Sequence, residues 1–112
     1  MNDVYVSRLE KLRASDLFGP DGFLYSGVQD PKQKAELSKH FDNVISEFIK
    51  LAVAGASKQD YLQLLQLSMQ DFDRDALDTE DAENIASNFE KIMDCIELDS
   101  SYGALNDWMY GF

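Results

Sequence analysis

Cysteine and histidine are almost missing from this chain of 112 residues, which contains only Cys95 and His40. A single cysteine cannot form a disulfide within the chain, so packing alone has to hold the fold together. Zinc sites built from several Cys and His side chains are excluded for the same reason. A lone thiol without a disulfide is typical of a reducing compartment, and we expect the protein to be cytoplasmic.

Long apolar runs are missing as well. No segment approaches the ~20 consecutive apolar residues that cross a bilayer. The first residues, MNDVYVSRLEKLRASD, mix acids and bases in place of the basic-then-apolar order of a signal peptide. We therefore expect a soluble protein with no membrane partner.

Strand-like alternation, internal repeats and low-complexity tracts do not occur either. Apolar residues recur instead at spacings of three and four, which is typical of amphipathic helices. With 45% hydrophobic residues, a chain of this length can bury one core without disulfides or metals. The sequence predicts an all-α protein, a compact bundle of four to six helices in a single domain that spans residues 1–112.

Capping residues mark the two central helices. Asp30 and Pro31 make a favourable helix start, and the helix that they open is predicted to run to Gly55. Ser57 and Asp60 form a carboxylate version of the capping box. The helix that follows them is predicted to end near Leu77.

Three further helices complete the predicted bundle. They are a weaker helix over 3–14, a helix that begins at Asp78 or Thr79, and a short terminal helix after Asp99. The segment SDLFGPDGFLYSGVQDP between the first two helices is predicted to be an ordered connection. It would pack on the core through its apolar side chains, Leu17, Phe18, Phe23, Leu24 and Tyr25.

Basic residues are scarce in the second half of the chain. Residues 1–59 hold eight acids and eight bases, whereas residues 60–112 hold thirteen acids against Arg74 and Lys91, so the whole net charge of −11 belongs there. This charge repels nucleic acid and anionic membranes and favours a cationic protein partner. Seven of the acids fall within DFDRDALDTEDAE and form the predicted partner-binding site: Asp71, Asp73, Asp75, Asp78, Glu80, Asp81 and Glu83.

The two ends of this acidic stretch have different explanations. Glu80, Asp81 and Glu83 are predicted in the first turn of a helix, where the dipole favours anions, so helix stability alone explains them. The three aspartates at 71, 73 and 75 are predicted in the last turns of the preceding helix, where the dipole disfavours anions. Asp71 and Asp75 would also be like charges four residues apart, offset only in part by Arg74. Stability does not explain these aspartates, which favours a role in binding. An ordinary solvated helix surface stays open as the alternative interpretation, because the rules for helix ends are weak.

Calcium binding is a minor alternative for the same stretch. Asp71, Asp73 and Asp75 match the first three ligand positions of an EF-hand loop. The pattern then fails, because Ala76 replaces the required glycine and Ala82 replaces the bidentate glutamate. We expect no metal and no cofactor.

No group of residues suggests catalysis. His40 follows Glu36 by four residues but has no second Glu-x-x-His partner, and we interpret it as a helix-surface residue. Cys95 lies beside an apolar stripe and is interpreted as a partly buried, inert thiol. The glycine-rich pieces lack a phosphate-loop pattern. We expect that the protein is not an enzyme.

Aromatic residues gather at the C-terminus, where Trp108, Tyr110 and Phe112 alternate with other residues. Exposed aromatic side chains anchor many protein interfaces, so a binding motif is one interpretation. Small helical bundles also close their cores with aromatic rings. The sequence favours packing.

The C-terminal motif Leu105-Asn106-x-Trp108-x-Tyr110-Gly111-Phe112, after a helix ending Met93-Asp94-x-Ile96, resembles a poorly characterised bacterial family of small, acidic, all-helical proteins. The resemblance covers the last thirty or so residues and implies the fold but no activity. The chain is also similar in type to bacterial toxin-immunity proteins, including those of contact-dependent inhibition systems. The similarity is that it is short, acidic and has no catalytic group.

These observations predict an immunity-type binding protein that neutralises a cationic toxin, such as a nuclease, by covering it with the acidic surface. A different class of function stays open. The acidic half of one copy could meet Lys32, Lys34 and Lys39 of another, which would make a self-associating structural or regulatory module. The expected state is a monomer or a weak homodimer.

Overall fold

The computed structural model describes residues 3–19, 27 and 30–110, and all of its regular structure is helical. The elements are α1 (Asp3–Arg13), α2 (Pro31–Ala54), α3 (Lys58–Gln70), the short 3-10 helix η1 (Arg74–Ala76), α4 (Thr79–Cys95) and α5 (Ala104–Tyr110). No strand occurs within these residues. The predicted all-α fold class is confirmed.

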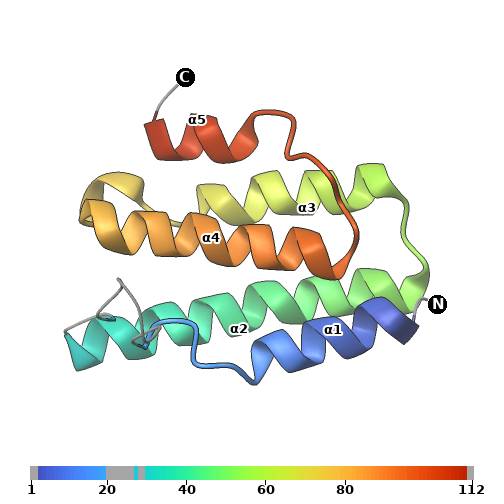
Figure 1. Ribbon diagram of the computed structural model, residues 1–112, viewed down its shortest axis with the longest axis horizontal. Coiled ribbons are helices and arrows are strands. Elements are labelled where there is room, and N and C mark those ends of the chain that lie inside the picture. Colours follow the sequence, from blue (N-terminus) through green and yellow to red (C-terminus); the bar gives the residue numbers. More distant parts are fainter. Residues whose placement is uncertain (1–2, 20–26, 28–29, 111–112) are drawn as a thin grey trace.

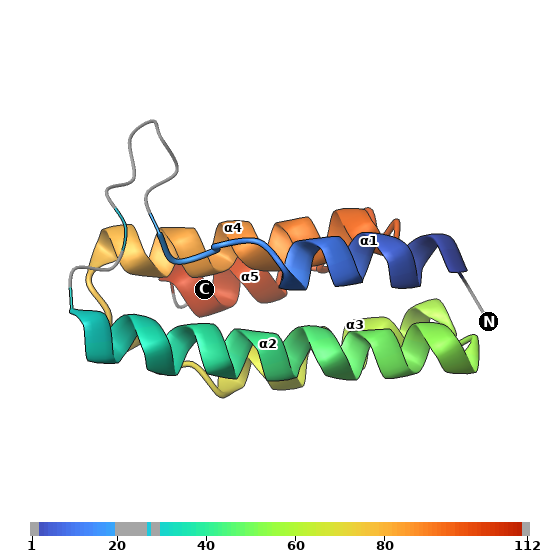
Figure 2. The ribbon, with the colours of Figure 1, turned by 90° about the horizontal axis from the view of Figure 1, so that it is seen from below.

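Successive helices run in alternating directions and form three layers (Figure 1). α1 and α2 form the first layer, and α1 packs mainly on α2 and also touches α4. α3 and α4 form the second layer. α5 packs against both of them on the side away from α1 and α2, as Figure 2 also shows. The molecule measures 38 × 32 × 23 Å.

An apolar core fills the space between the first two layers. Side chains from four different helices are completely buried, among them Leu9, Ile45, Phe48, Leu65 and Ile85. They occupy the helical spacings that the sequence pattern predicted, because each helix turns one apolar stripe inward. In the described residues, no helix is long and apolar enough to cross a membrane.

The predicted caps of α2 and α3 are present. Asp30 accepts a hydrogen bond from the amide of Lys32 at 3.0 Å, and Pro31 is the first helical residue. Gly55 ends α2 with a φ of 71°, a left-handed conformation that costs glycine little. Ser57 and Asp60 form the expected reciprocal capping box.

The predicted end of the third helix near Leu77 is wrong. α3 ends at Gln70, and Asp71 is its C-cap. Phe72 leaves the helix and enters the core, where it is 5% exposed. Asp73 then starts η1. Asp71 and Asp75 are therefore not a like-charge pair on one helix face. Asp71 does lie at the negative end of α3 as predicted, whereas Asp73 and Asp75 lie beyond the helix.

The end of α4 is tied to α1. Glu97 has a left-handed φ of 54°, and the amide of Leu98 donates to the carbonyl of Met93 at 2.9 Å, as in a Schellman motif. The Glu97 carboxylate accepts a hydrogen bond from the Tyr5 hydroxyl at 2.8 Å and lies 3.9 Å from Arg8. Its side chain thus joins the first helix to the end of the fourth.

The connection between α1 and α2 packs on the core as predicted, as far as it is described. Phe18 is 1% exposed, and Leu17 is partly buried against the core. The carbonyl of Leu17 accepts hydrogen bonds from the side-chain amides of Asn84 and Asn88 on α4. The predicted core residues Phe23, Leu24 and Tyr25 lie outside the described residues.

Candidate acidic interface

The charge imbalance of the sequence becomes an imbalance between the layers. α1 and α2 lie in residues 1–59, whose acids and bases cancel. α4, α5 and all of α3 except its first two residues lie in residues 60–112, which carry the net −11. Because α5 covers α3 and α4 on the side away from α1 and α2, one side of the molecule is strongly acidic (Figure 1).

The turn between α3 and α4, residues 71–78, holds four of the seven predicted site residues, and all four are exposed: Asp71, Asp73, Asp75 and Asp78. We call it the acidic turn. Asp73 accepts a hydrogen bond from the amide of Asp75 at 3.1 Å and caps η1. Asp78 accepts from the amide of Asp81 at 2.8 Å and caps α4. Local backbone hydrogen bonds therefore explain two of these carboxylates, whereas Asp71 and Asp75 make no side-chain hydrogen bond or ion pair within the described residues.

Arg74, which was expected to offset part of the charge of the acidic turn, points its side chain elsewhere. Its guanidinium donates to two backbone carbonyls, from Nε to Met109 at 3.2 Å and from Nη1 to Leu77 at 3.3 Å. No ion pair joins it to a carboxylate in the described part of the chain. The only base of the acidic turn thus holds none of its carboxylates in an ion pair.

Phe72 fixes the acidic turn to the core. Its ring stacks on His40 of α2 with the centroids 4.1 Å apart, and it lies 5.8 Å from the rings of Phe41 and Phe89. Its carbonyl accepts a hydrogen bond from the Trp108 indole at 3.1 Å. His40, which we expected on the helix surface, is therefore partly buried. A groove of about 240 Å³ lies beside this stack, and Asp71 and Asp73 are on its rim.

The three acids at the start of α4 differ in their exposure. Glu80 and Glu83 are exposed, but Asp81 is only 9% exposed and cannot belong to a broad contact surface. Glu80 and Asp81 lie in the first turn of the helix as predicted, whereas Glu83 lies in the second turn. The structure therefore brings six of the seven predicted carboxylates to the surface.

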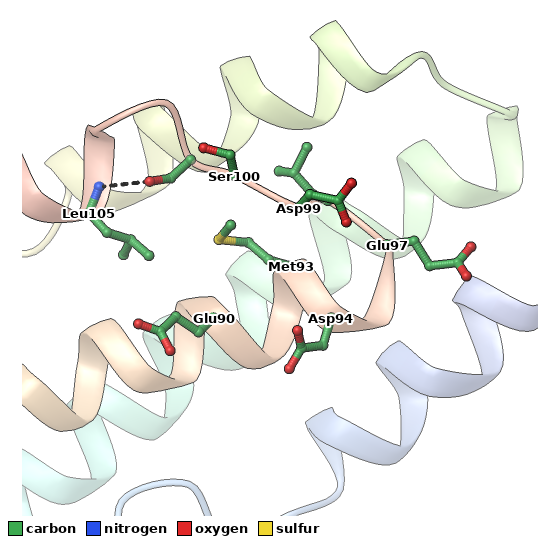
Figure 3. A pocket seen from close by; sticks show the side chains of 9 residues that line it. Glu90, Met93, Asp94, Glu97, Asp99, Ser100 and Leu105 are labelled. Carbon is green, nitrogen blue, oxygen red and sulfur yellow. Dashed lines mark hydrogen bonds between the residues drawn. The ribbon is translucent and has the colours of Figure 1, made fainter.

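A second acidic region escaped the sequence interpretation. A groove of about 660 Å³ lies between the C-terminal end of α4 and the segment that leads to α5, with an apolar floor that includes Met93 and Leu105. Four acids line it, namely Glu90, Asp94, Glu97 and Asp99. Figure 3 shows their carboxylates spread around the groove, with Glu97 directed towards α1. The spacing of Glu90 and Asp94 on one face of α4 was a signal for two of them.

The described residues contain no group of three His, Cys, Asp or Glu side chains arranged to hold a metal ion. Cys95 is 9% exposed, and burial raises the pKa of its thiol above the ordinary value. A raised pKa lowers the fraction of the nucleophilic thiolate. Cys95 thus has the environment of the inert thiol that we predicted.

The C-terminal aromatic residues divide between core and surface. Trp108 is partly buried and packs against the core, but Tyr110 is 59% exposed. Phe112 lies outside the described residues. Packing therefore explains Trp108.

The whole chain, residues 1–112, matches the family described as "Domain of unknown function (DUF4844)". The chain belongs to this family. Its fold is also similar to the crystal structure of a DUF3571 family protein from Acinetobacter baumannii, with a TM-score of 0.93 and 38% sequence identity over 98% of this chain and 91% of that one. A search of curated proteins found no match.

These similarities extend the resemblance seen in the sequence. The C-terminal motif covered about the last thirty residues, whereas both matches include the α1 and α2 layer as well. The matching structure supports the fold and shows a bacterial relative, and neither it nor the family description assigns an activity.

Proposed function

We propose that this protein is an immunity-type binding protein whose acidic side covers a cationic bacterial toxin, such as a nuclease. The observation that carries the proposal is the acidic turn, in which Asp71 and Asp75 are exposed and have no ion pair within the described residues. Arg74, the base next to them, is bound to backbone carbonyls.

Uncompensated charge on one side suits a partner that binds by electrostatic complementarity. A toxin that cleaves nucleic acid needs a basic surface for its substrate, and clustered carboxylates can cover such a surface. The net charge of −11 also speeds the encounter by steering, an effect that salt screens. Phe72 supports the proposal because it holds the turn on the core, which lowers the entropy that binding has to remove.

The first experiment is to capture partners with the full chain as bait, in a lysate of the source bacterium at low and at high salt. The proposal expects one basic protein that is retained at low salt and released at high salt. That protein is then expressed alone and together with the full chain. Toxicity that disappears on co-expression supports the immunity function, and a captured protein that is harmless by itself contradicts it.

The second experiment tests the site through the association rate. The double variant Asp71→Lys, Asp75→Lys spares Asp73 and Asp78, whose side chains cap helices. The matched control, Glu10→Lys with Asp42→Lys, makes the same change of charge at exposed positions on α1 and α2. We expect unchanged or raised thermal stability in the site variant and a loss of about tenfold or more in association rate at low salt, well beyond the control. Equal rates in the two variants would remove the acidic turn from the interface.

Self-association is the second candidate, favoured by bases on the neutral layer. Lys32 and Lys39 are exposed and form no ion pair within the described residues, whereas Lys34 lies 3.4 Å from Asp16. Light scattering over a salt series separates the two functions. A dimer that dissociates as the salt concentration rises favours a self-associating module. A monomer at every salt concentration favours binding to a different protein.

A further inference from the structure

Two side-chain hydrogen bonds join the acidic turn to α5, and they run in opposite directions. Arg74 of the turn donates to the carbonyl of Met109 in α5 at 3.2 Å. Trp108 of α5 donates its indole N–H to the carbonyl of Phe72 in the turn at 3.1 Å. Each element thus supplies the other with a donor for a backbone carbonyl.

α5 depends on such contacts because it is short. Seven residues are too few for a helix to be stable in water without tertiary contacts. Met109 is buried, and Trp108 is partly buried. The Arg74 guanidinium lies at the last turn of α5, where unpaired carbonyls and the helix dipole favour a cation.

The acidic turn has equally little structure of its own. η1 is a single turn of 3-10 helix, closed by the hydrogen bonds from Ala76 to Asp73 and from Leu77 to Arg74. Runs of this type are short and have poor hydrogen-bond geometry. Repulsion among the exposed aspartates opposes the turn further.

We infer that Arg74 and Trp108 are positioning residues that join the acidic turn and α5 into one cooperative unit. The orientation of the exposed aspartates of the acidic turn then depends on α5, although none of these four residues belongs to α5. Binding of a cationic partner to the turn consequently also changes the stability of α5. This last step rests on the proposed function, whereas the coupling of the two elements does not.

The test perturbs each element and observes the other by amide hydrogen exchange and by the fluorescence of Trp108, the only tryptophan. Asp73→Ala removes the cap of η1, and Asp75→Ala is the control because it removes the same charge but no side-chain hydrogen bond within the described residues. We expect Asp73→Ala to speed exchange in α5 about fivefold or more and to shift the Trp108 emission to longer wavelength. The buried part of α2 should keep its exchange rates. Exchange in α5 within twofold of the Asp75→Ala rates overturns the inference.

The reverse perturbation starts from α5. Trp108→Phe keeps an aromatic ring but removes the indole donor, and we expect faster exchange of the Ala76 and Leu77 amides with little change in α2. Asn106→Ala, at an exposed position on α5, is the control. Acceleration throughout the molecule indicates a general loss of stability and overturns the coupling.

Arg74→Met is a second variant in case Trp108→Phe does not fold. Lys91→Met is its matched control, since Arg74 and Lys91 are the only bases of the acidic half. We expect faster exchange in the acidic turn and in α5 together in Arg74→Met, and in neither of them in Lys91→Met. Independent changes in the two elements contradict the inference.

A decalysine probe at low salt separates this inference from the proposed function. In the unaltered protein we expect the probe to slow exchange in α5, and in Trp108→Phe we expect slowing in the acidic turn only. If Asp71→Lys with Asp75→Lys binds the captured toxin normally while the exchange of the two elements stays coupled, the proposed binding site fails and the cooperative unit stands.

Discussion

Replacement of Phe72 by leucine should weaken both the core and the attachment of the acidic turn. The ring of Phe72 contacts those of His40, Phe41 and Phe89, at centroid distances of 4.1, 5.8 and 5.8 Å. Leucine restores much of the apolar area but none of these ring contacts, which contribute about 0.5–1.5 kcal/mol each beyond area. Their sum predicts a loss of roughly 1.5–4.5 kcal/mol in the free energy of unfolding, and alanine, which also leaves a cavity, should cost about 3–5 kcal/mol.

Urea unfolding followed by circular dichroism at 222 nm measures this loss, provided that the transition remains two-state. Phe48→Leu is the control, because Phe48 is fully buried and its ring has one neighbour among the described residues, Tyr61 at 6.4 Å. We expect the control to lose less than Phe72→Leu by about 1 kcal/mol or more. Equal losses would refute the conclusion that this ring cluster fixes the turn.

Two more predictions concern the start and the end of α4. Asp78→Ala removes the N-cap that accepts from the amide of Asp81 at 2.8 Å, and it should lower the free energy of unfolding by about 1 kcal/mol in urea; an unchanged urea midpoint would contradict the cap. At the C-terminal end of α4, burial raises the pKa of the Cys95 thiol. The buried neutral thiol therefore contributes its full stability to the fold below the pKa of the unfolded thiol, and this contribution is lost as pH rises through the folded pKa. Cys95→Ala should therefore flatten the decline of Tm above about pH 8.5, and parallel declines in a pH series of melting curves would count against it.

The sequence predicted the starts of α2, α3 and α4 because their caps are local. Asp30, Ser57 and Asp78 satisfy backbone amides within three residues of themselves, so neighbouring residues contain the whole signal. The end of α3 has no such signal, since residues 71–78 contain no glycine or proline. A tertiary contact ends this helix, namely the burial of Phe72 between α2, α4 and α5.

In the candidate site, too, local features could be predicted from the sequence and tertiary contacts could not. Exposure of Asp71, Asp73 and Asp75 could be predicted from the density of charge, because so many carboxylates cannot be buried without partners. The destination of the Arg74 side chain could not, because one of its two acceptors belongs to Met109, 35 residues further along the chain. Asp99 was missed for a similar reason, since the groove that it lines forms only when the chain turns back after α4.

The hydrogen bond between Tyr5 and Glu97 joins residues 92 positions apart, which affects the order of folding. Local helix pairs close early, whereas contacts of long sequence separation have to close a large loop first. The ribosome makes the chain from its N-terminus, so α1 can meet α2 well before the end of α4 exists. We expect Leu9 in the nascent chain to pack against α2 alone until Glu97 has emerged. The contacts between α1 and the end of α4 should therefore be among the last in the molecule to form.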